Sequence, residues 1–476
     1  MNPDPGNPDA SPDAADLAIV GNGAVAMSIA IEHRRRAPDA RVVLIGPGRR
    51  PGSASLAAGI MLASHSEVEA NTFRHAAGRA KFELVKAAVE RWPGWMSELA
   101  VIARGESPRI HHGTVVLDNP NVSGFDPPNF DAILEALRRD DAEHESVDPS
   151  DLRGYRSAAH LRASRGVRIP GDGAVDAVAV IALLDGAAGA LGIERLDGRA
   201  ESVRDGIVRC DLGREVRAKR IVVAAGAASD GLLRRIPELV GRVPRILHGT
   251  GVGLRCRATP DLAMPAEVLR TPNRGAGLGV YHVPSGSDRF YLGATNVVSA
   301  EPRAHARLGS LHLVLQSAMD EISADLRHAE CRMVTGHRPI AEDGLPLLGA
   351  TSLPGLWIAT GTRRDGVTAA PEIARRLVNE MLGEGDPLPA AFSPERAPIS
   401  MFDREQGVEV AVRSRLVGPG SNAEPRAGRL DDEVRRQVER LYDRAGLVVG
   451  VPAELLDLYA DGRLDASRLH THAKAD

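Results

Sequence analysis

An apolar run near the N-terminus ends in small residues whose spacing suits a nucleotide. Gly21, Gly23 and Ala26 form the pattern Gly-x-Gly-x-x-Ala. Gly21 permits a sharp turn out of a strand, and Gly23 lets a pyrophosphate approach the backbone because it has no Cβ atom. The backbone N–H groups that open the next helix, beginning with Ala24 and Val25, would then face the phosphates.

The elements around this turn strengthen the prediction. The sequence predicts a helix from Ala24 to about Arg36 and a second strand from Arg41 to Ile45. Strand, turn, helix and strand in this order are typical of the dinucleotide-binding βαβ unit. A glycine turn in an ordinary α/β protein is the alternative, but the flanking elements favour the nucleotide. Gly46 stands where such folds usually place an acidic residue for the ribose, which weakens the case for NAD.

Composition limits the class of protein. The chain has 476 residues, of which 43% are hydrophobic, so it is long enough for two domains or one large composite domain. A net charge of −4 does not suggest a nucleic-acid surface. Three distant cysteines show no metal-ligand spacing, and no apolar run reaches membrane-spanning length. We therefore expect a cytoplasmic protein with reduced thiols, no bound metal and no membrane contact.

Further segments place small residues, strands and arginines in a recurring order. Residues 52–62 are small and then apolar, which suits either tight helix packing or backbone that lines a cofactor. Residues 220–226 predict a buried strand that ends in small residues, and residues 279–284 with 290–295 predict a hairpin. The pattern ends with a strand at 356–361, a turn at 362–368 and a helix at 370–382. The remaining predicted elements are helices at 67–98, 131–139, 176–191 and 304–326 and strands at 114–117, 200–203 and 207–211.

At these motifs the sequence resembles the glycine oxidase and D-amino acid oxidase family of flavoproteins, which includes sarcosine oxidase. Residues 53–61 resemble the family's Ser-Ala-Ala-Gly-Met segment beside the flavin, and residues 222–229 resemble Val-Val-Ala-Ala-Gly-Ala-Trp-Ser, with Ala228 in place of Trp. The most specific match is residues 335–349, which resemble Gly-x-Arg-Pro-x-x-x-Asp-x-x-Pro-x-x-Gly. The flavin-contacting loop that follows has Thr362 where the family usually has His.

The resemblance implies an α/β fold in which a Rossmann-type FAD-binding domain is interleaved with an antiparallel-sheet substrate domain, plus a short helical C-terminal extension. The expected division is a disordered tail at 1–15, an FAD-binding domain at 16–90, 166–245 and 336–385, a substrate domain at 91–165 and 246–335, and a linker with helical extension at 386–476.

The implied cofactor is FAD. We expect it to be non-covalent because no cysteine stands next to Arg338 and Pro339, and Cys331 lies seven residues upstream. Backbone contacts would offset the missing acidic residue at Gly46. The residues predicted to bind FAD are Gly21, Gly23, Ala24, Val25, Gly46, Ser53, Ala54, Ala58, Gly59, Ile60, Ala200, Gly226, Gly361, Thr362, Arg363, Asp365, Gly366, Val367 and Thr368.

The resemblance also implies a reaction and the residues that carry it. The expected reaction is oxidation of the amine of glycine or an N-substituted glycine by hydride transfer to flavin, with O2 reduced to H2O2. Arg338 and Arg364 fall at positions where the family binds the substrate carboxylate, although Arg363 could replace Arg364 by a shift of one residue. Tyr281 would close the pocket or donate a hydrogen bond, unless it only packs in the hairpin. Two other functions stay open: a dehydrogenase that passes electrons to a quinone or protein, and a catalytically weakened flavoprotein subunit.

The resemblance does not cover the C-terminal part of the chain. Residues 383–430, rich in Pro, Gly and Arg, predict a linker or wrapping loop, and residues 431–446 and 452–460 predict two short helices. Each helix carries an apolar stripe, which more often packs on its own domain than on a partner. We expect the extension to pack on the body, or on a second subunit in a homo-oligomer, without taking part in catalysis.

Overall fold

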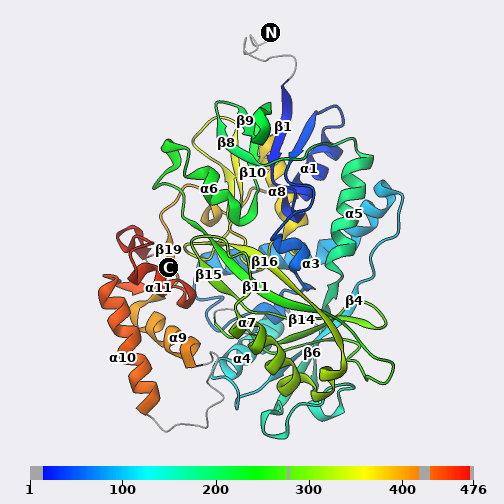
Figure 1. Cartoon of the computed structure of the whole chain (residues 1–476), viewed down its shortest axis with the longest axis vertical. Coiled ribbons are helices and arrows are strands. Elements are labelled where there is room, and N and C mark those ends of the chain that lie inside the picture. Colours follow the sequence, from blue (N-terminus) through cyan, green and yellow to red (C-terminus); the bar gives the residue numbers. More distant parts are fainter. Residues whose placement is uncertain (1–13, 276–278, 417–428, 472–476) are drawn as a thin grey trace.

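The computed structural model describes residues 14–275, 279–416 and 429–471. The predicted N-terminal tail, apart from its last two residues, and residues 417–428 of the predicted linker lie outside this range. Two large sheets organise the described chain (Figure 1). The fold class predicted above, a Rossmann-type sheet interleaved with an antiparallel sheet and followed by helices, is confirmed.

The first sheet holds the glycine turn. Its main path runs in the order β17-β18-β10-β1-β2-β7, and its pairs are parallel except for β17 with β18. The strands are β1 (Ala15–Val20), β2 (Val42–Ile45), β7 (Glu194–Leu196), β10 (Glu215–Val223), β17 (Leu347–Ala350) and β18 (Leu356–Thr360), and the hairpin of β8 (Ala200–Arg204) and β9 (Ile207–Cys210) extends β10.

Both faces of the first sheet are buried, as expected for parallel strands covered on two sides. On β1, Leu17 and Ile19 face one core, whereas Ala18 and Val20 face the other. The first core is completed by the helices α1 (Ala24–Arg36), α3 (Ala76–Ala103), α5 (Ala177–Ala190) and α8 (Ala370–Leu382). The second core is covered by the β8–β9 hairpin and α6 (Ser229–Leu233).

The second sheet is mixed and mostly antiparallel. Its main path is β15-β11-β14-β13-β12-β4-β6-β3, with β16 paired to β11 and β5 paired to β6. The strands are β3 (Ile60–Leu62), β4 (His111–Asp118), β5 (Glu145–Val147), β6 (Arg165–Val175), β11 (Ile246–Arg257), β12 (Val268–Arg270), β13 (Tyr281–Pro284), β14 (Arg289–Gly293), β15 (Val297–Ser299) and β16 (Glu330–Ala341). Helices α4 (Asp126–Arg139) and α7 (Leu308–Ser317) pack against this sheet. The strands β3 and β6 pair within this second sheet, although the sequence analysis assigned most of their residues to the FAD-binding domain. The division into domains stays a prediction.

Two predicted helices have different bounds in the structure. The helix predicted at 67–98 begins only at Ala76, after a short 3-10 turn at 65–67, and continues to Ala103. The helix predicted at 304–326 is α-helical only over 308–317, and a π-helical turn and a 3-10 turn follow it. In both cases the apolar spacing indicated helix but did not mark where tighter or wider turns replace the α-helical hydrogen bonds.

The linker predicted at 383–430 is wrong over residues 404–416, which form the helix α9 (Arg404–Leu416). Its Arg-rich composition hides a helical apolar spacing of Val408, Ala411 and Val412, which are all buried. Helices α10 (Arg429–Arg444) and α11 (Leu456–Ala460) agree in place with the two predicted helices, although α11 is shorter and begins after a 3-10 turn. The three helices form the orange-to-red extension beside the second sheet in Figure 1.

Candidate active site between the two sheets

A cavity of about 820 Å³ lies where the two sheets meet. Its wall comes from the glycine turn after β1, the segment 50–61, the strands β11 and β16, and the loop 362–368. Of the residues predicted to bind FAD or substrate, every one except Gly361 lines this cavity. Residues from opposite ends of the sequence are therefore brought together at one site.

The glycine turn has the geometry that the motif predicts. Gly21 has a φ of +129°, and a Cβ atom there would lie 2.2 Å from the carbonyl oxygen of Ala224. Gly23 is the N-cap of helix α1 and offers no side-chain cap, and the Ala24 N–H donates to Ser55 Oγ at 3.2 Å. The helix N-terminus thus presents backbone donors to the cavity, as a pyrophosphate requires.

We expect Gly21→Ala to lower the free energy of unfolding by about 2–4 kcal/mol and to abolish FAD uptake, because the substitution combines a strained φ with a backbone clash. Thermal unfolding and flavin titration measure the two effects. The matched control is Gly189→Ala in α5, where a Cβ atom meets nothing within 4 Å. It should leave stability unchanged or raise it by up to about 1 kcal/mol. Normal FAD binding by Gly21→Ala would contradict the role of the turn.

The structure explains why Gly46 lacks an acidic side chain. A Cβ atom at Gly46 would lie 2.7 Å from Cγ of Asn22, so the amide of Asn22 fills the space. Asn22 donates a hydrogen bond to the Pro47 carbonyl at 3.0 Å and lines the cavity. Asn22 is a residue that sequence reasoning missed, since it occupies a variable position of the glycine motif.

The segment beside the predicted flavin site is held by hydrogen bonds to its backbone. The Tyr291 hydroxyl donates to the Ala57 carbonyl at 3.0 Å, and Thr368 Oγ1 donates to the Met61 carbonyl at 2.9 Å. A Cβ atom at Gly59 would lie 2.5 Å from the ring of Tyr291. The small residues therefore permit close packing against β14, so tight packing and a cavity-lining backbone occur together here.

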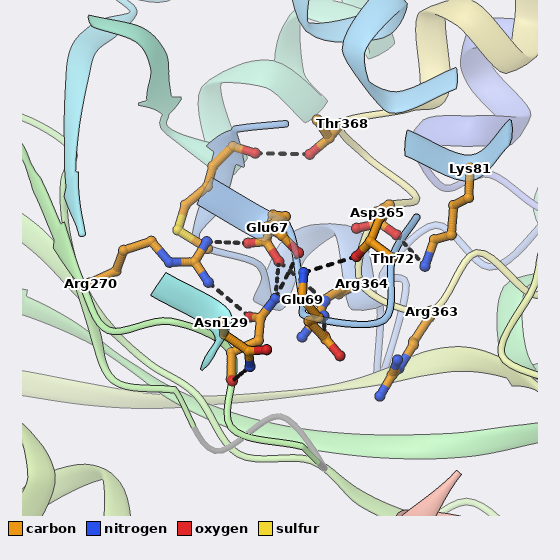
Figure 2. Close-up of polar contacts among 12 residues, drawn as sticks. Glu67, Glu69, Thr72, Lys81, Asn129, Arg270, Arg363, Arg364, Asp365 and Thr368 are labelled. Carbon is orange, nitrogen blue, oxygen red and sulfur yellow. Dashed lines mark hydrogen bonds and ion pairs between the residues drawn. The ribbon is translucent and has the colours of Figure 1, made fainter. Parts of the chain in front are cut away.

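The four arginines on the substrate side of the cavity differ in their partners. Arg364 pairs with Glu67 at 3.3 Å and with Glu69, and the buried Arg270 pairs with Glu67 (Figure 2). Arg363 pairs with Glu454, whereas Arg338 shows no carboxylate partner among the described residues and donates to the Thr295 carbonyl at 2.8 Å. Arg199 and Arg303 also line the cavity and form no ion pair with any residue that the structure describes, but neither lies on β16 beside the loop 362–368.

Glu67 is a largely buried carboxylate that sequence reasoning missed. Burial raises the pKa of its carboxyl, but the neighbouring Arg270 and Arg364 guanidiniums outweigh burial and hold that pKa at about 2. Asn273 also donates to Glu67, at 3.1 Å to Oε2. No motif marks this cluster, because its members come from three separate segments of the chain.

Tyr281 stands close to these charges. Its ring stacks on that of Tyr291, with centroids 6.1 Å apart and planes 13° from parallel. Burial raises the pKa of the Tyr281 hydroxyl, and the Arg338 guanidinium partly offsets that rise. Tyr281 thus packs in the hairpin and lines the cavity at the same time, and its hydroxyl stays protonated near neutral pH.

Two histidines that were not predicted also line the cavity, His248 on β11 and His337 on β16. The rings of His248 and His337 lie 5.6 Å apart, and His337 Nδ1 is 3.2 Å from Thr250 Oγ1. Burial lowers the pKa of both imidazoles. Alternation along the strand places His337 on the face opposite Arg338, and the register with β11 pairs His337 with Thr250.

Comparison with known proteins decides the family. A sequence model of the DAO family, described as FAD dependent oxidoreductase, matches residues 16–380. The chain belongs to this family. The resemblance noted in the sequence and the FAD cofactor are thereby confirmed.

Individual relatives are more distant. The bifunctional protein ThiO/ThiG of Nostoc sp. is 25% identical over 402 residues, which cover 80% of this chain and 55% of that protein. The glycine oxidase of Pseudomonas aeruginosa is 26% identical over 185 residues, which cover 38% of this chain and 46% of the oxidase. The chain therefore spans about half the length of these curated relatives.

Solved structures share the fold at low identity. A glycine oxidase from Geobacillus kaustophilus has a TM-score of 0.67 at 22% identity, and the match covers 81% of this chain and 99% of that one. An iminodiacetate oxidase from Chelativorans sp. BNC1 has a TM-score of 0.65 at 22% identity, covering 79% and 98%. No helix among the described residues is long and apolar enough to cross a membrane.

Proposed function

We propose that this flavoprotein oxidises the amine of an amino acid, glycine or an N-substituted glycine, to an imine that hydrolyses in water, with O2 reduced to H2O2. The observation that carries the proposal is Arg338. Its guanidinium lies at the cavity without a carboxylate partner among the described residues, in contrast to Arg270, Arg363 and Arg364. A substrate carboxylate would supply that partner.

The cavity fits FAD. The strained glycine turn and the uncapped start of α1 suit the pyrophosphate, and Asn22 offers an amide oxygen near the ribose position. Ala200, one of the residues predicted to bind FAD, lines the cavity together with Gly198 and Arg199. None of the three cysteines lines the cavity, which supports non-covalent binding.

The protein's part in the reaction is to orient the substrate and to control charge. FAD, when bound, accepts the electron pair of the substrate's α-carbon–hydrogen bond. Arg338 has donors free for a bidentate carboxylate contact, since Thr295 uses one of them. With a pKa of about 2, the Glu67 carboxylate is too weak a base to take a proton from a substrate ammonium group. The substrate therefore enters as the neutral amine or loses its proton to solvent.

We expect the purified protein to be yellow and to release free FAD in acid. Glycine, sarcosine or a related N-substituted glycine should bleach the flavin absorbance under nitrogen, and oxygen consumption with peroxide release should follow in air. Bleaching without oxygen consumption would favour a dehydrogenase with a quinone or protein acceptor. A protein that takes up FAD but is bleached by no amine in the panel would contradict the proposal.

A further inference from the structure

The loop 362–368 lines the cavity, and three of its charged side chains anchor it to other parts of the chain. Three consecutive residues of the loop form ion pairs with three different segments. The pairs are Arg363 with Glu454 at 2.5 Å, Arg364 with Glu67 at 3.3 Å and with Glu69, and Asp365 with Lys81 at 2.8 Å. Figure 2 shows Arg364 turned toward Glu67 and Glu69, and Arg363 turned away from them.

The Arg363 anchor connects the loop to the C-terminal extension. Both side chains are largely buried, with 18% of Arg363 and 6% of Glu454 exposed. The backbone of Arg363 has a φ of +54°, a strained conformation for a residue with a side chain. Its N–H donates to the Pro339 carbonyl at 2.7 Å, so the loop is tied to β16 directly beside Arg338. Surrounding contacts must hold such a backbone in place.

The rest of the extension supports the same part of β16. Ile340 of β16 and Leu247 of β11 are buried in one apolar cluster with residues of α9, α10 and α11. The Tyr459 hydroxyl donates to Glu342 Oε1 at 3.1 Å, just beyond the end of β16. The extension therefore contacts the strand that carries Arg338 as well as the loop that faces the cavity.

We propose that the C-terminal extension is part of the active-site architecture and that Glu454 is a positioning residue, which acts through Arg363 to fix the loop 362–368 against FAD. This inference rests on the proposed function, because the loop must face bound FAD. The extension lies beyond residue 380, where the family match ends. It refines the expectation that the extension packs on the body without taking part in catalysis, because Glu454 itself does not line the cavity.

The test is Glu454→Gln, which keeps the shape of the side chain and removes its charge. We expect the dissociation constant of FAD to rise about tenfold, equivalent to about 1.4 kcal/mol. Hydrogen–deuterium exchange in the peptide covering 362–368 should become faster in protein with and without FAD, because the loop loses an anchor. Glu454→Asp, which retains the charge, should recover part of both effects.

The matched control is Asp457→Asn, which removes an ion pair of the same extension. Asp457 pairs with Arg415 at 2.7 Å and its side chain is 69% exposed, so neither FAD binding nor loop exchange should change. The double variant Arg363→Met with Glu454→Gln should bind FAD no more weakly than Arg363→Met alone. The two substitutions break the same ion pair, so the second adds no further loss.

The proposal is overturned if Glu454→Gln matches the wild type in FAD affinity and loop exchange, or if Asp457→Asn changes both to the same degree. A wild-type protein that binds no FAD would instead refute the proposed function. The exchange measurement on protein without FAD would still show whether Glu454 anchors the loop.

Discussion

Arg338→Met should lower kcat/KM for the amino-acid substrate by about 30-fold to several thousand-fold. This range corresponds to about 2–5 kcal/mol, as found when one partner of a buried charge pair is removed. The substrate carboxylate leaves water when it enters the cavity, and the guanidinium compensates for that loss with two parallel hydrogen bonds. Arg338→Lys should also lower kcat/KM, because it keeps the charge but loses the fork.

Flavin content should stay near that of the wild type, since Arg338 faces the substrate. Arg332→Met is the matched control, because Arg332 is exposed on the same strand, β16, and does not line the cavity. The decisive measurement compares a carboxylated substrate with its decarboxylated amine. If Arg338→Met slows both by the same factor, Arg338 does not bind the carboxylate. If it loses stability and flavin together, Arg338 only braces the domain interface.

Glu67→Gln should lower the free energy of unfolding at neutral pH by about 3–5 kcal/mol, because it leaves a buried guanidinium without its counter-ion. The side chain of Arg270 is 2% exposed and has Glu67 as its carboxylate partner among the described residues, whereas Arg364 keeps Glu69. Denaturant unfolding measures the change. Glu145→Gln is the control: Glu145 pairs with Arg168 but is 66% exposed, so its loss should cost no more than about 1 kcal/mol.

The same pair predicts a pH dependence. The pKa of Glu67 is about 2 in the folded protein, below its ordinary value of 4.5. Its ionised form therefore stabilises the folded state above pH 4.5, and that contribution disappears as the pH falls from 4.5 toward 2. The stability difference between wild type and Glu67→Gln should shrink across this window. A difference that stays constant would show that the charge of Glu67 does not stabilise the protein.

Local patterns were sufficient to predict the strands and helix around the glycine turn. Three short segments could be recognised from neighbouring residues alone. They are the glycine turn with its strand and helix, the strand leading into Gly226, and the arginine motif at Arg338. The α9 helix was missed because an Arg-rich composition concealed its apolar spacing, and helix bounds were shifted where 3-10 or π turns occur.

The sequence by itself determined the family, the fold class and the segments that line the cavity, because each depends on spacing within a few residues or on a motif. Only the tertiary structure decided which charges meet. It pairs Arg364 with Glu67 and Glu69, and it leaves Arg338 without a carboxylate among the described residues. It also brings Glu454 to Arg363, 91 residues away along the chain. Such partners cannot be read from local spacing, because ion pairing in a core depends on how separate elements pack.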